Sequence, residues 1–433
     1  MPVDLEKIKA RFSATTTVLA VGRVRAVTGL SVRASLPGAR IGDVVVIRRK
    51  GEPLPAEIVG FDAGEAVVLP LGSLSGVGPD DPVESTGAPL EVRASESLLG
   101  RVVDGLGRPI DGRPAPEGTA VPVDRSPPPP LGRRPVVSAL ATGVRVIDGL
   151  LTLGEGQRIG LFAGSGVGKS TLLGAIARGT AADVVVVALV GERGREVGEF
   201  LEHSLGAEGR KKSIVVVATS DAPALERLRA AQVATAYAEY FRDHGRRVML
   251  LVDSVTRFAR AQREVGLSAG EPPARRGYPP SVFAMLPRLL ERSGQGERGS
   301  VTAIYTVLVE GGDMDEPVAD EVRGIVDGHV VLDRTIAARG RYPAVDVTVS
   351  LSRVMSSIVD QAHQGAARRM RDLVALYEAK RDLVLLGAYA KGTDIELDRA
   401  IELMPQIEAF LRQGADEVVP FAESVEKLTG AVK

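Results

Sequence analysis

Cysteine is absent from this 433-residue sequence. Disulfide bonds, thiolate metal sites and a cysteine nucleophile are therefore excluded, and folding does not require an oxidising compartment. Histidine is scarce as well, and its four copies show no metal-ligand spacing, so we expect no zinc site.

Long hydrophobic runs are also missing. The apolar run from Val184 to Val190 is far too short to cross a bilayer, which takes about 20 such residues. The N-terminal residues Met1 to Asp4 do not begin a signal peptide. We therefore expect a cytoplasmic protein that contacts a membrane only through partners.

The chain has neither the aromatic side chains nor the excess positive charge that are typical of proteins that bind nucleic acid. Aromatic residues make up 4% of the sequence, and 54 basic residues against 55 acidic ones leave a net charge of −1. Bulk charge therefore offers no attraction for a phosphate backbone. What is present is an ordinary globular composition, 44% hydrophobic and 25% charged, in a chain long enough for two or three domains.

The most informative stretch is a glycine-rich turn between a predicted strand, Arg158 to Ala163, and a predicted helix. Backbone N–H groups in such a turn can cradle phosphates, and the helix start adds roughly half a positive charge. Lys169 would bind the β- and γ-phosphates, and Ser170 would ligate Mg²⁺. The strict pattern begins with glycine, where this sequence has Ala163. The expected phosphate-binding residues are Gly164, Ser165, Gly166, Val167, Gly168, Lys169, Ser170 and Thr171.

Two carboxylates follow predicted buried strands. An apolar run from Val248 ends in Asp253, the position at which phosphate-loop enzymes place the acid that supports Mg²⁺. Glu192 follows the strand from Val184 to Val190 and would reach the same sheet edge, where a carboxylate can polarise the attacking water. Charged neighbours surround Glu192, so a solvated helix start is an equally good interpretation of its spacing alone.

An arginine supplied across a subunit interface can accelerate phosphoryl transfer by about 10³- to 10⁵-fold. Arg353 follows the last predicted strand of the central domain and is a candidate for this role. Position alone does not single it out among 54 basic residues.

Hydrophobic periodicity divides the chain into distinct folded parts. Short alternating strands from Thr15 to about Thr86 predict a small β-barrel. Apolar strands that alternate with helices from Val136 to Arg353 predict a parallel sheet covered on both faces. The expected domains are a helical segment at 1–14, the barrel at 15–90, a linker with the central domain at 91–355, and a helical domain at 356–433.

The same periodicities place the individual elements. An amphipathic helix is expected at residues 4–12, with Leu5, Ile8 and Phe12 on one face, and a strand pair at the sheet edge is expected within 98–111. Thr393 and Glu396 form a predicted capping box. The expected strands of the central domain are 159–163, 184–190, 214–218, 248–253, 301–309, 330–332 and 345–349, and the expected helices include 222–243, 361–386, 394–412 and 424–428.

Taken together, the motifs resemble those of the ATPases of bacterial type III secretion, the injectisome and flagellar export enzymes. These are relatives of the catalytic subunits of rotary ATP synthases. The resemblance implies an α/β protein with an N-terminal β-barrel, a RecA-like P-loop domain with a parallel sheet and a C-terminal helical domain, assembled as a homohexamer. The matching stretches, in family order, are Ala163–Ser170, Gly191–Glu196, Asp253–Phe258, Gly277–Phe283, Tyr305–Glu310 and Ser352–Met355.

The resemblance also implies residue roles, all directed at ATP and Mg²⁺ between neighbouring subunits. One position departs from the family pattern: Ala415 stands where ATP synthase subunits place an aromatic residue. The second face of the adenine pocket is therefore expected to be open, with Gln413 as a replacement contact and loose purine discrimination. By motif, Lys169 holds phosphates, Ser170 and Asp253 serve Mg²⁺, Glu192 is the general base, Arg193 and Arg257 contact the γ-phosphate, Arg353 enters the next subunit's site, and Tyr342 packs on adenine.

The resulting hypothesis is a Mg²⁺-dependent ATPase whose ring energises protein export by releasing or unfolding cargo held by chaperones. The implied partners are a peripheral stator, a central stalk and chaperone–cargo complexes, which would hold the ring at the inner membrane. The stretches Pro273–Tyr278 and Glu316–Arg323 favour the injectisome branch over the flagellar branch.

Two other functions remain open at the level of sequence. A hexameric RNA translocase similar to Rho has the same central domain, but it would need stacking aromatics in the barrel, where Phe61 is the only aromatic residue from Thr15 to Thr86. A non-catalytic ring subunit is the other alternative. The presence of both Glu192 and Arg353 in one chain argues against it.

Overall fold

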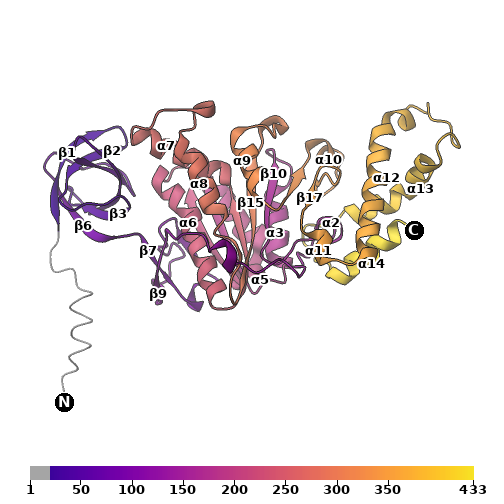
Figure 1. Cartoon of the computed structure of the whole chain (residues 1–433), viewed down its shortest axis with the longest axis horizontal. Coiled ribbons are helices and arrows are strands. Elements are labelled where there is room, and N and C mark those ends of the chain that lie inside the picture. Colours follow the sequence, from indigo (N-terminus) through magenta and orange to yellow (C-terminus); the bar gives the residue numbers. More distant parts are fainter. Residues whose placement is uncertain (1–19) are drawn as a thin grey trace, which may run out of the picture.

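The computed structural model describes residues 20–433, so the predicted helix at 4–12 and the start of the predicted barrel lie outside the described residues. Figure 1 shows a barrel at one end, an α/β body in the middle and a helical region at the other end. This architecture confirms the fold class predicted from the sequence.

Six antiparallel strands form the barrel, which closes because β1 pairs with both β2 and β6. Alternate side chains such as Val32 and Ala34 fill its interior, in agreement with the period of two in the sequence. The sequence did not reveal β6, because proline, glycine and small polar residues are more typical of turns. The strands are β1 (Val21–Thr28), β2 (Ser31–Ser35), β3 (Asp43–Ile47), β4 (Leu54–Asp62), β5 (Glu65–Pro70) and β6 (Pro82–Pro89).

The connector adds an edge strand to the central sheet. β8 runs parallel to β12, and Val103 bridges to Pro109, as predicted for this segment. A separate two-stranded sheet of β7 and β9 was not predicted. The connector contains β7 (Glu91–Ala94), η1 (Glu96–Leu98), β8 (Val102–Asp104), β9 (Thr119–Pro122) and η2 (Pro130–Gly132).

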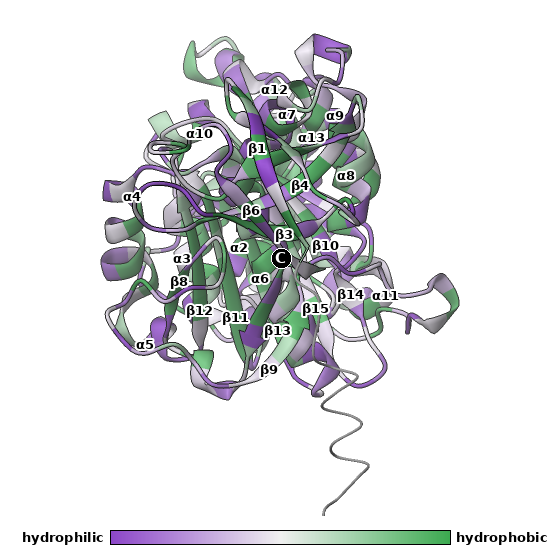
Figure 2. Cartoon of the chain, turned by 90° about the vertical axis from the view of Figure 1, so that its left-hand side faces the viewer, coloured by the Kyte–Doolittle hydropathy of each residue, from purple (hydrophilic) through white to green (hydrophobic). Residues whose placement is uncertain are grey.

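The central sheet has the strand order β17-β16-β10-β15-β13-β11-β12-β8, and β14 pairs with β15. All of its pairings are parallel except those of β14 and β17. Apolar clusters cover both faces, so the inner strands are hydrophobic along their length, as Figure 2 shows in green. The strands are β10 (Arg158–Ala163), β11 (Val184–Glu192), β12 (Ser213–Thr219), β13 (Arg247–Asp253), β14 (Gly294–Gln295), β15 (Ser300–Leu308), β16 (Gly328–Leu332) and β17 (Leu351–Ser352).

Helices flank this sheet and form the C-terminal region. The flanking helices are α2 (Arg145–Leu150), α3 (Lys169–Gly179), α4 (Gly194–Glu199), η3 (Phe200–Leu205), α5 (Gly206–Lys211), α6 (Ala224–Asp243), α7 (Val255–Ser268), η4 (Arg275–Gly277), α8 (Pro280–Leu290), η5 (Glu310–Gly312), α9 (Pro317–Ile325) and α10 (Arg334–Ala338). The C-terminal helices are α11 (Met355–Ile358), α12 (Gln361–Leu385), α13 (Ile395–Leu411) and α14 (Phe421–Ala431).

Two local predictions are wrong. Residues 345–349 do not form a strand beyond a single bridge of Val345 to Leu332, because Asp346 turns the chain by accepting hydrogen bonds from the Thr348 backbone and hydroxyl. The cap of α13 is Asp394 rather than Thr393, since the Asp394 carboxylate accepts from the first amides of the helix. A carboxylate one residue closer to the helix serves the same orphan donors.

The barrel contacts the central domain through a buried ion pair. Glu57 on β4 binds the guanidinium of Arg229 on α6 in a bidentate contact, with Nε at 2.9 Å from Oε2. Both side chains are nearly inaccessible to solvent. Burial raises the pKa of Glu57, and the Arg229 charge opposes that rise.

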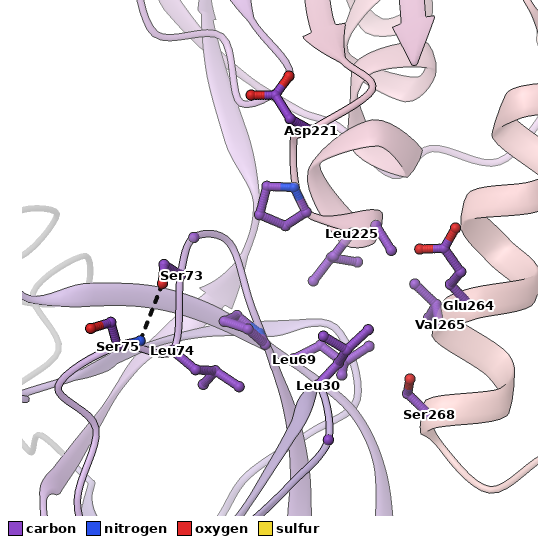
Figure 3. Close-up of a pocket in the computed structure, with 15 residues that line it drawn as sticks. Leu30, Leu69, Ser73, Leu74, Ser75, Asp221, Leu225, Glu264, Val265 and Ser268 are labelled. Atoms are coloured by element: carbon purple, nitrogen blue, oxygen red, sulfur yellow. Dashed lines mark hydrogen bonds between the residues drawn. The ribbon is translucent and has the colours of Figure 1, made fainter.

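Beside the barrel lies a mostly apolar cavity of about 470 Å³ between the barrel turns and the helices α6 and α7. Figure 3 shows Leu30 and Leu69 of the barrel facing Leu225 and Val265 of the central domain. The packing between the two domains is therefore incomplete at this cavity. No helix within residues 20–433 has the length and apolarity to cross a membrane.

Removing one partner of the ion pair should be costly. Because Arg229→Ala leaves the Glu57 carboxylate buried without a cation, we expect a loss of about 3 kcal/mol in the free energy of unfolding at pH 8. The raised pKa of Glu57 sets the sign of the pH dependence: protonation removes the buried charge, so the loss shrinks as the pH falls.

Urea unfolding at pH 8 and pH 5 measures this loss. Arg33→Ala is the matched control, because its partner Asp62 and Arg33 itself are both about half exposed, which limits the expected loss to about 1 kcal/mol or less. Equal losses for the two variants would contradict a role for the buried pair.

Candidate active site

The phosphate loop follows an inner strand of the sheet. β10 is flanked by β15 and β16 and ends at Ala163, and α3 begins at Lys169. Gly166 and Gly168 adopt φ values of +79° and +87°, which side chains rarely tolerate. Nothing lies within 4 Å of the position that a Cβ on Gly166 would occupy, so the turn is open at the N-terminus of an 11-residue helix. This cradle fits a phosphate group.

Lys169 meets two carboxylates at the same sheet edge. Its Nζ contacts Asp253 Oδ1 and lies 3.6 Å from Glu192 Oε1. The carboxylates converge because β11 and β13 are adjacent parallel strands that end at this edge. Thr306 on β15 donates a 2.7 Å hydrogen bond to Asp253 Oδ1 and orients it. The structure therefore brings together three residues that are spread over more than 80 positions of the sequence, from Lys169 to Asp253.

Glu192 is the strongly perturbed acid of this group. Burial, followed by the nearby Asp253 charge and a hydrogen bond with Glu196, raises the pKa of Glu192 to about 7. Lys169 and Arg257 oppose the rise without cancelling it. A carboxylate that titrates near neutral pH is suited to proton abstraction from a water.

Arg257 holds Glu192 from the opposite side. Its Nη2 lies 3.1 Å from Glu192 Oε2, and its Nη1 donates to the Gly191 carbonyl. A Cβ at Gly191 would lie 3.0 Å from the Arg257 Cδ, and Gly191 has a φ of +69°. Glycine at this position therefore permits the close approach of the arginine.

The oxygen ligands at this edge fit Mg²⁺. Ser170 lies exposed on the first turn of α3, and the almost fully buried Asp253 side chain contacts the neighbouring Lys169. Among residues 20–433, no three His, Cys, Asp or Glu side chains gather into a metal cluster. Mg²⁺ suits such a sparse protein shell, because it keeps waters and takes further oxygens from substrate phosphates.

A second cavity of about 420 Å³ adjoins the end of the phosphate loop. Tyr342 lines it, with ring carbons 3.4 and 3.5 Å from the place of a Cβ on Gly168. Gln413 also lines it, but its amide is engaged: Oε1 accepts from the Arg145 amide at 2.7 Å, and Nε2 donates to the Gly143 carbonyl at 2.8 Å. The other lining side chains are mostly apolar, which suits a flat base next to the phosphates.

Comparison with known proteins gives the family. Sequence profiles match the nucleotide-binding domain of the ATP synthase alpha/beta family at residues 143–352, its beta-barrel domain at 24–87, and the T3SS EscN ATPase C-terminal domain at 359–430. The chain is 53% identical to the flagellum-specific ATP synthase of Bacillus subtilis over 94% of both chains. It is 52% identical to the type 3 secretion system ATPase of Xanthomonas euvesicatoria over 94% of this chain and 93% of that one.

Solved structures agree. The assembled ATPase EscN of the enteropathogenic Escherichia coli type III secretion system superimposes with a TM-score of 0.90 at 45% identity, covering 95% of this chain and all of that one. EscN in complex with its central stalk EscO gives 0.89 over the same shares. The chain belongs to the type III secretion and flagellar export ATPases. The resemblance stated from the motifs is thereby confirmed, as is ATPase activity.

The export ATPase gathers most of the predicted residues at one place. The loop Gly164–Thr171 adjoins Asp253, Glu192 and Arg257, and the pocket of Tyr342 and Gln413 follows. The Arg193 side chain forms no ion pair within this group: it is 74% exposed and pairs at 3.0 Å with Glu196, which in turn hydrogen-bonds to Glu192. Arg353 is exposed and lines a different cavity, between β17 and α12. The individual roles of these residues stay predictions.

Two residues of the site were missed. Thr306 is a polar position within the apolar strand β15, and its register beside Asp253 could have revealed it. Arg334 gives no such signal. Its Nε lies 2.7 Å from the place of a Cβ on Gly164, so only glycine leaves room for this guanidinium against the phosphate loop of the ATPase.

The buried Glu192 charge should reduce the stability of the ATPase at alkaline pH. Because its pKa is raised to about 7, the charged form is disfavoured in the fold above that pH and the neutral form is accommodated below it. Glu192→Gln should therefore raise the Tm relative to wild type more at pH 8.5 than at pH 5.

Calorimetry at both pH values measures this difference. Glu199→Gln on α4 serves as the control, since the Glu199 side chain is 52% exposed and its removal should shift the Tm equally at both pH values. A Glu192→Gln shift that is independent of pH would contradict the placement of a buried, titrating carboxylate.

Proposed function

We propose that this chain hydrolyses MgATP in a homohexameric ring that energises protein export through a type III secretion apparatus. The observation that carries the proposal is the buried Glu192, set beside Lys169 at the open phosphate loop. Membership of the export ATPases supplies the biological setting.

The chemistry follows from the side chains. Lys169 and the amide-rich loop bind the β- and γ-phosphates, and the apolar pocket of Tyr342 holds the base. Glu192 accepts a proton from the attacking water, and Arg257 fixes the orientation of its carboxylate. Ser170 and Asp253 would hold Mg²⁺, which neutralises phosphate charge when bound.

The site needs a further positive charge, which we assign to Arg353 of the neighbouring subunit. Arg353 follows β17 at the surface and does not line the phosphate loop or base pocket of its own chain. An exposed arginine without a carboxylate partner among residues 20–433 is free to reach another chain. The similarity to the assembled EscN supports a ring in which such contacts form.

The same similarity supports the partners. EscN is described in complex with its central stalk EscO, and we propose that this ATPase binds a central stalk in the same way. A peripheral stator and export chaperone–cargo complexes complete the proposed set. We place the ring in the cytoplasm, held peripherally at the inner membrane by these partners.

Of the two branches, we propose the injectisome on the strength of the stretches Pro273–Tyr278 and Glu316–Arg323. The flagellar branch is the alternative, because the 53% identity to the Bacillus subtilis enzyme and the 52% identity to the Xanthomonas euvesicatoria enzyme are nearly equal. Deletion of the gene in its own bacterium separates them. Loss of effector secretion with intact flagella supports the first, and loss of flagella with intact secretion supports the second.

Hydrolysis should depend on Lys169 and Glu192 in different ways. Lys169→Ala should abolish turnover by weakening phosphate binding. Glu192→Gln should lower kcat by about 10²-fold or more and leave nucleotide affinity nearly unchanged, because it removes only the proton acceptor. Steady-state rates and equilibrium binding of a fluorescent nucleotide measure both effects, and a wild-type rate in either variant would reject the site.

Shared sites should make specific activity rise steeply with protein concentration, because each site needs a neighbour. Arg353→Ala should lower kcat by about 10³-fold with a small effect on nucleotide affinity. Rates measured over a dilution series test both points. A flat concentration dependence together with a wild-type rate for Arg353→Ala would show that each site is complete within one chain.

A further inference from the structure

A cavity of about 420 Å³ lies between the end of β17 and the helix α12. Three arginines line it, namely Arg353, Arg368 and Arg371, together with Gln364. We call the cavity that these four residues line the basic cavity. Asp372 is the only acidic residue in its lining.

The arrangement follows from helix geometry. Gln364, Arg368 and Arg371 are spaced four and three residues apart on α12, so they share one face of the helix. That face is turned to the segment that carries Arg353. The neighbouring Arg369 lies on another face and forms a 2.9 Å ion pair with Glu396 on α13.

No carboxylate forms a direct ion pair with the arginines of the basic cavity within the described chain, and the Asp372 charge acts on Arg371 only from a longer distance. Among residues 20–433, no carboxylate oxygen lies within 4.0 Å of the guanidinium groups of Arg353, Arg368 or Arg371, in contrast to Arg369. Arg371 donates to the Leu150 carbonyl, and its Nε is buried without a partner. Burial lowers the pKa of Arg371.

Three like charges in one cavity repel one another, and an anion placed between them relieves this repulsion. Guanidinium groups match phosphate oxygens in a fork geometry, so a phosphate group is the anion that they bind best. Under the proposed function, Arg353 approaches the phosphates of a nucleotide held by the neighbouring subunit. Arg368, which is exposed in the same cavity, accompanies it.

We propose that Arg368 is a second arginine that binds, together with Arg353, a phosphate group of the neighbouring subunit's nucleotide. The proposal rests on the proposed function and extends it by one residue. In this proposal, the arginines in the cavity between β17 and α12 bind substrate rather than stabilise the fold.

Arg368→Ala should lower kcat at least tenfold in the assembled ring, because it removes a charged hydrogen bond to the substrate. Arg368→Lys should recover part of the rate, since the charge remains. Arg369→Ala is the matched control on the same helix, and its kcat should stay within about twofold of wild type. Equal rates for Arg368→Ala and Arg369→Ala would overturn the proposal.

Mixed rings distinguish action across the interface from a structural role. In a mixture of Arg368→Ala with Lys169→Ala, the second chain supplies an intact Arg368 to the intact phosphate loop of the first. The activity of the mixture should exceed the sum of the two separate activities. If Arg368 acts only within its own chain, mixing gives no gain, and the proposal is wrong.

The same mixture made with Arg353→Ala tests the underlying function separately. If mixing with Lys169→Ala raises the activity of Arg353→Ala but not that of Arg368→Ala, only the inference about Arg368 is rejected. Arg353→Ala with a wild-type rate rejects the proposed interfacial mechanism itself. A variant Arg368→Ala with unchanged kcat and altered inhibition by added inorganic phosphate would assign the cavity to free phosphate and overturn the proposal.

Discussion

The contact of Lys169 with Asp253 and Glu192 is the interaction on which the rest of the structure depends. One cation meets two nearly inaccessible carboxylates at the edge of a sheet, and each of the three belongs to a different strand or helix. Unpaired, these charges would be expensive to bury. Together they tolerate burial, and the parallel order of β10, β13 and β11 is what brings them to one edge.

The positive charges around Glu192 do not fully offset its burial and the nearby Asp253 charge, and this keeps the Glu192 pKa high. Two carboxylates share one lysine and one arginine, and Glu192 keeps a pKa of about 7. If cations fully offset the Glu192 charge, its pKa would fall and the carboxylate would be a poor base. The ATPase therefore holds a destabilising charge at the place where the proposed function requires a proton acceptor.

Local patterns made much of this arrangement predictable, and long-range packing made the rest invisible. Local sequence is enough to predict the phosphate loop and the two acids that end strands, Glu192 and Asp253. The direction of a parallel strand fixes which edge of the sheet its last residue reaches. The pair of Glu57 and Arg229 joins residues more than 170 positions apart, and nothing near either residue announces the partner. The contact of Arg334 with Gly164 could not be predicted for the same reason. Strand β6 could not be predicted because its composition is typical of turns.

The pocket lined by Tyr342 and Gln413 ties the end of the phosphate loop to the C-terminal helices. Gln413 follows α13, and its backbone amide donates to the Tyr342 carbonyl at 2.9 Å while its side chain holds the Gly143 and Arg145 backbone. Arg145 in turn donates to the Phe410 carbonyl at 2.9 Å, so the end of α13 is fastened to the start of α2. A shift of the helical region relative to the sheet must therefore move Tyr342 or break these bonds. Under the proposed function, the two bindings are linked: a partner that displaces the helical region would change nucleotide affinity, and a bound nucleotide would change the affinity for that partner by the same factor.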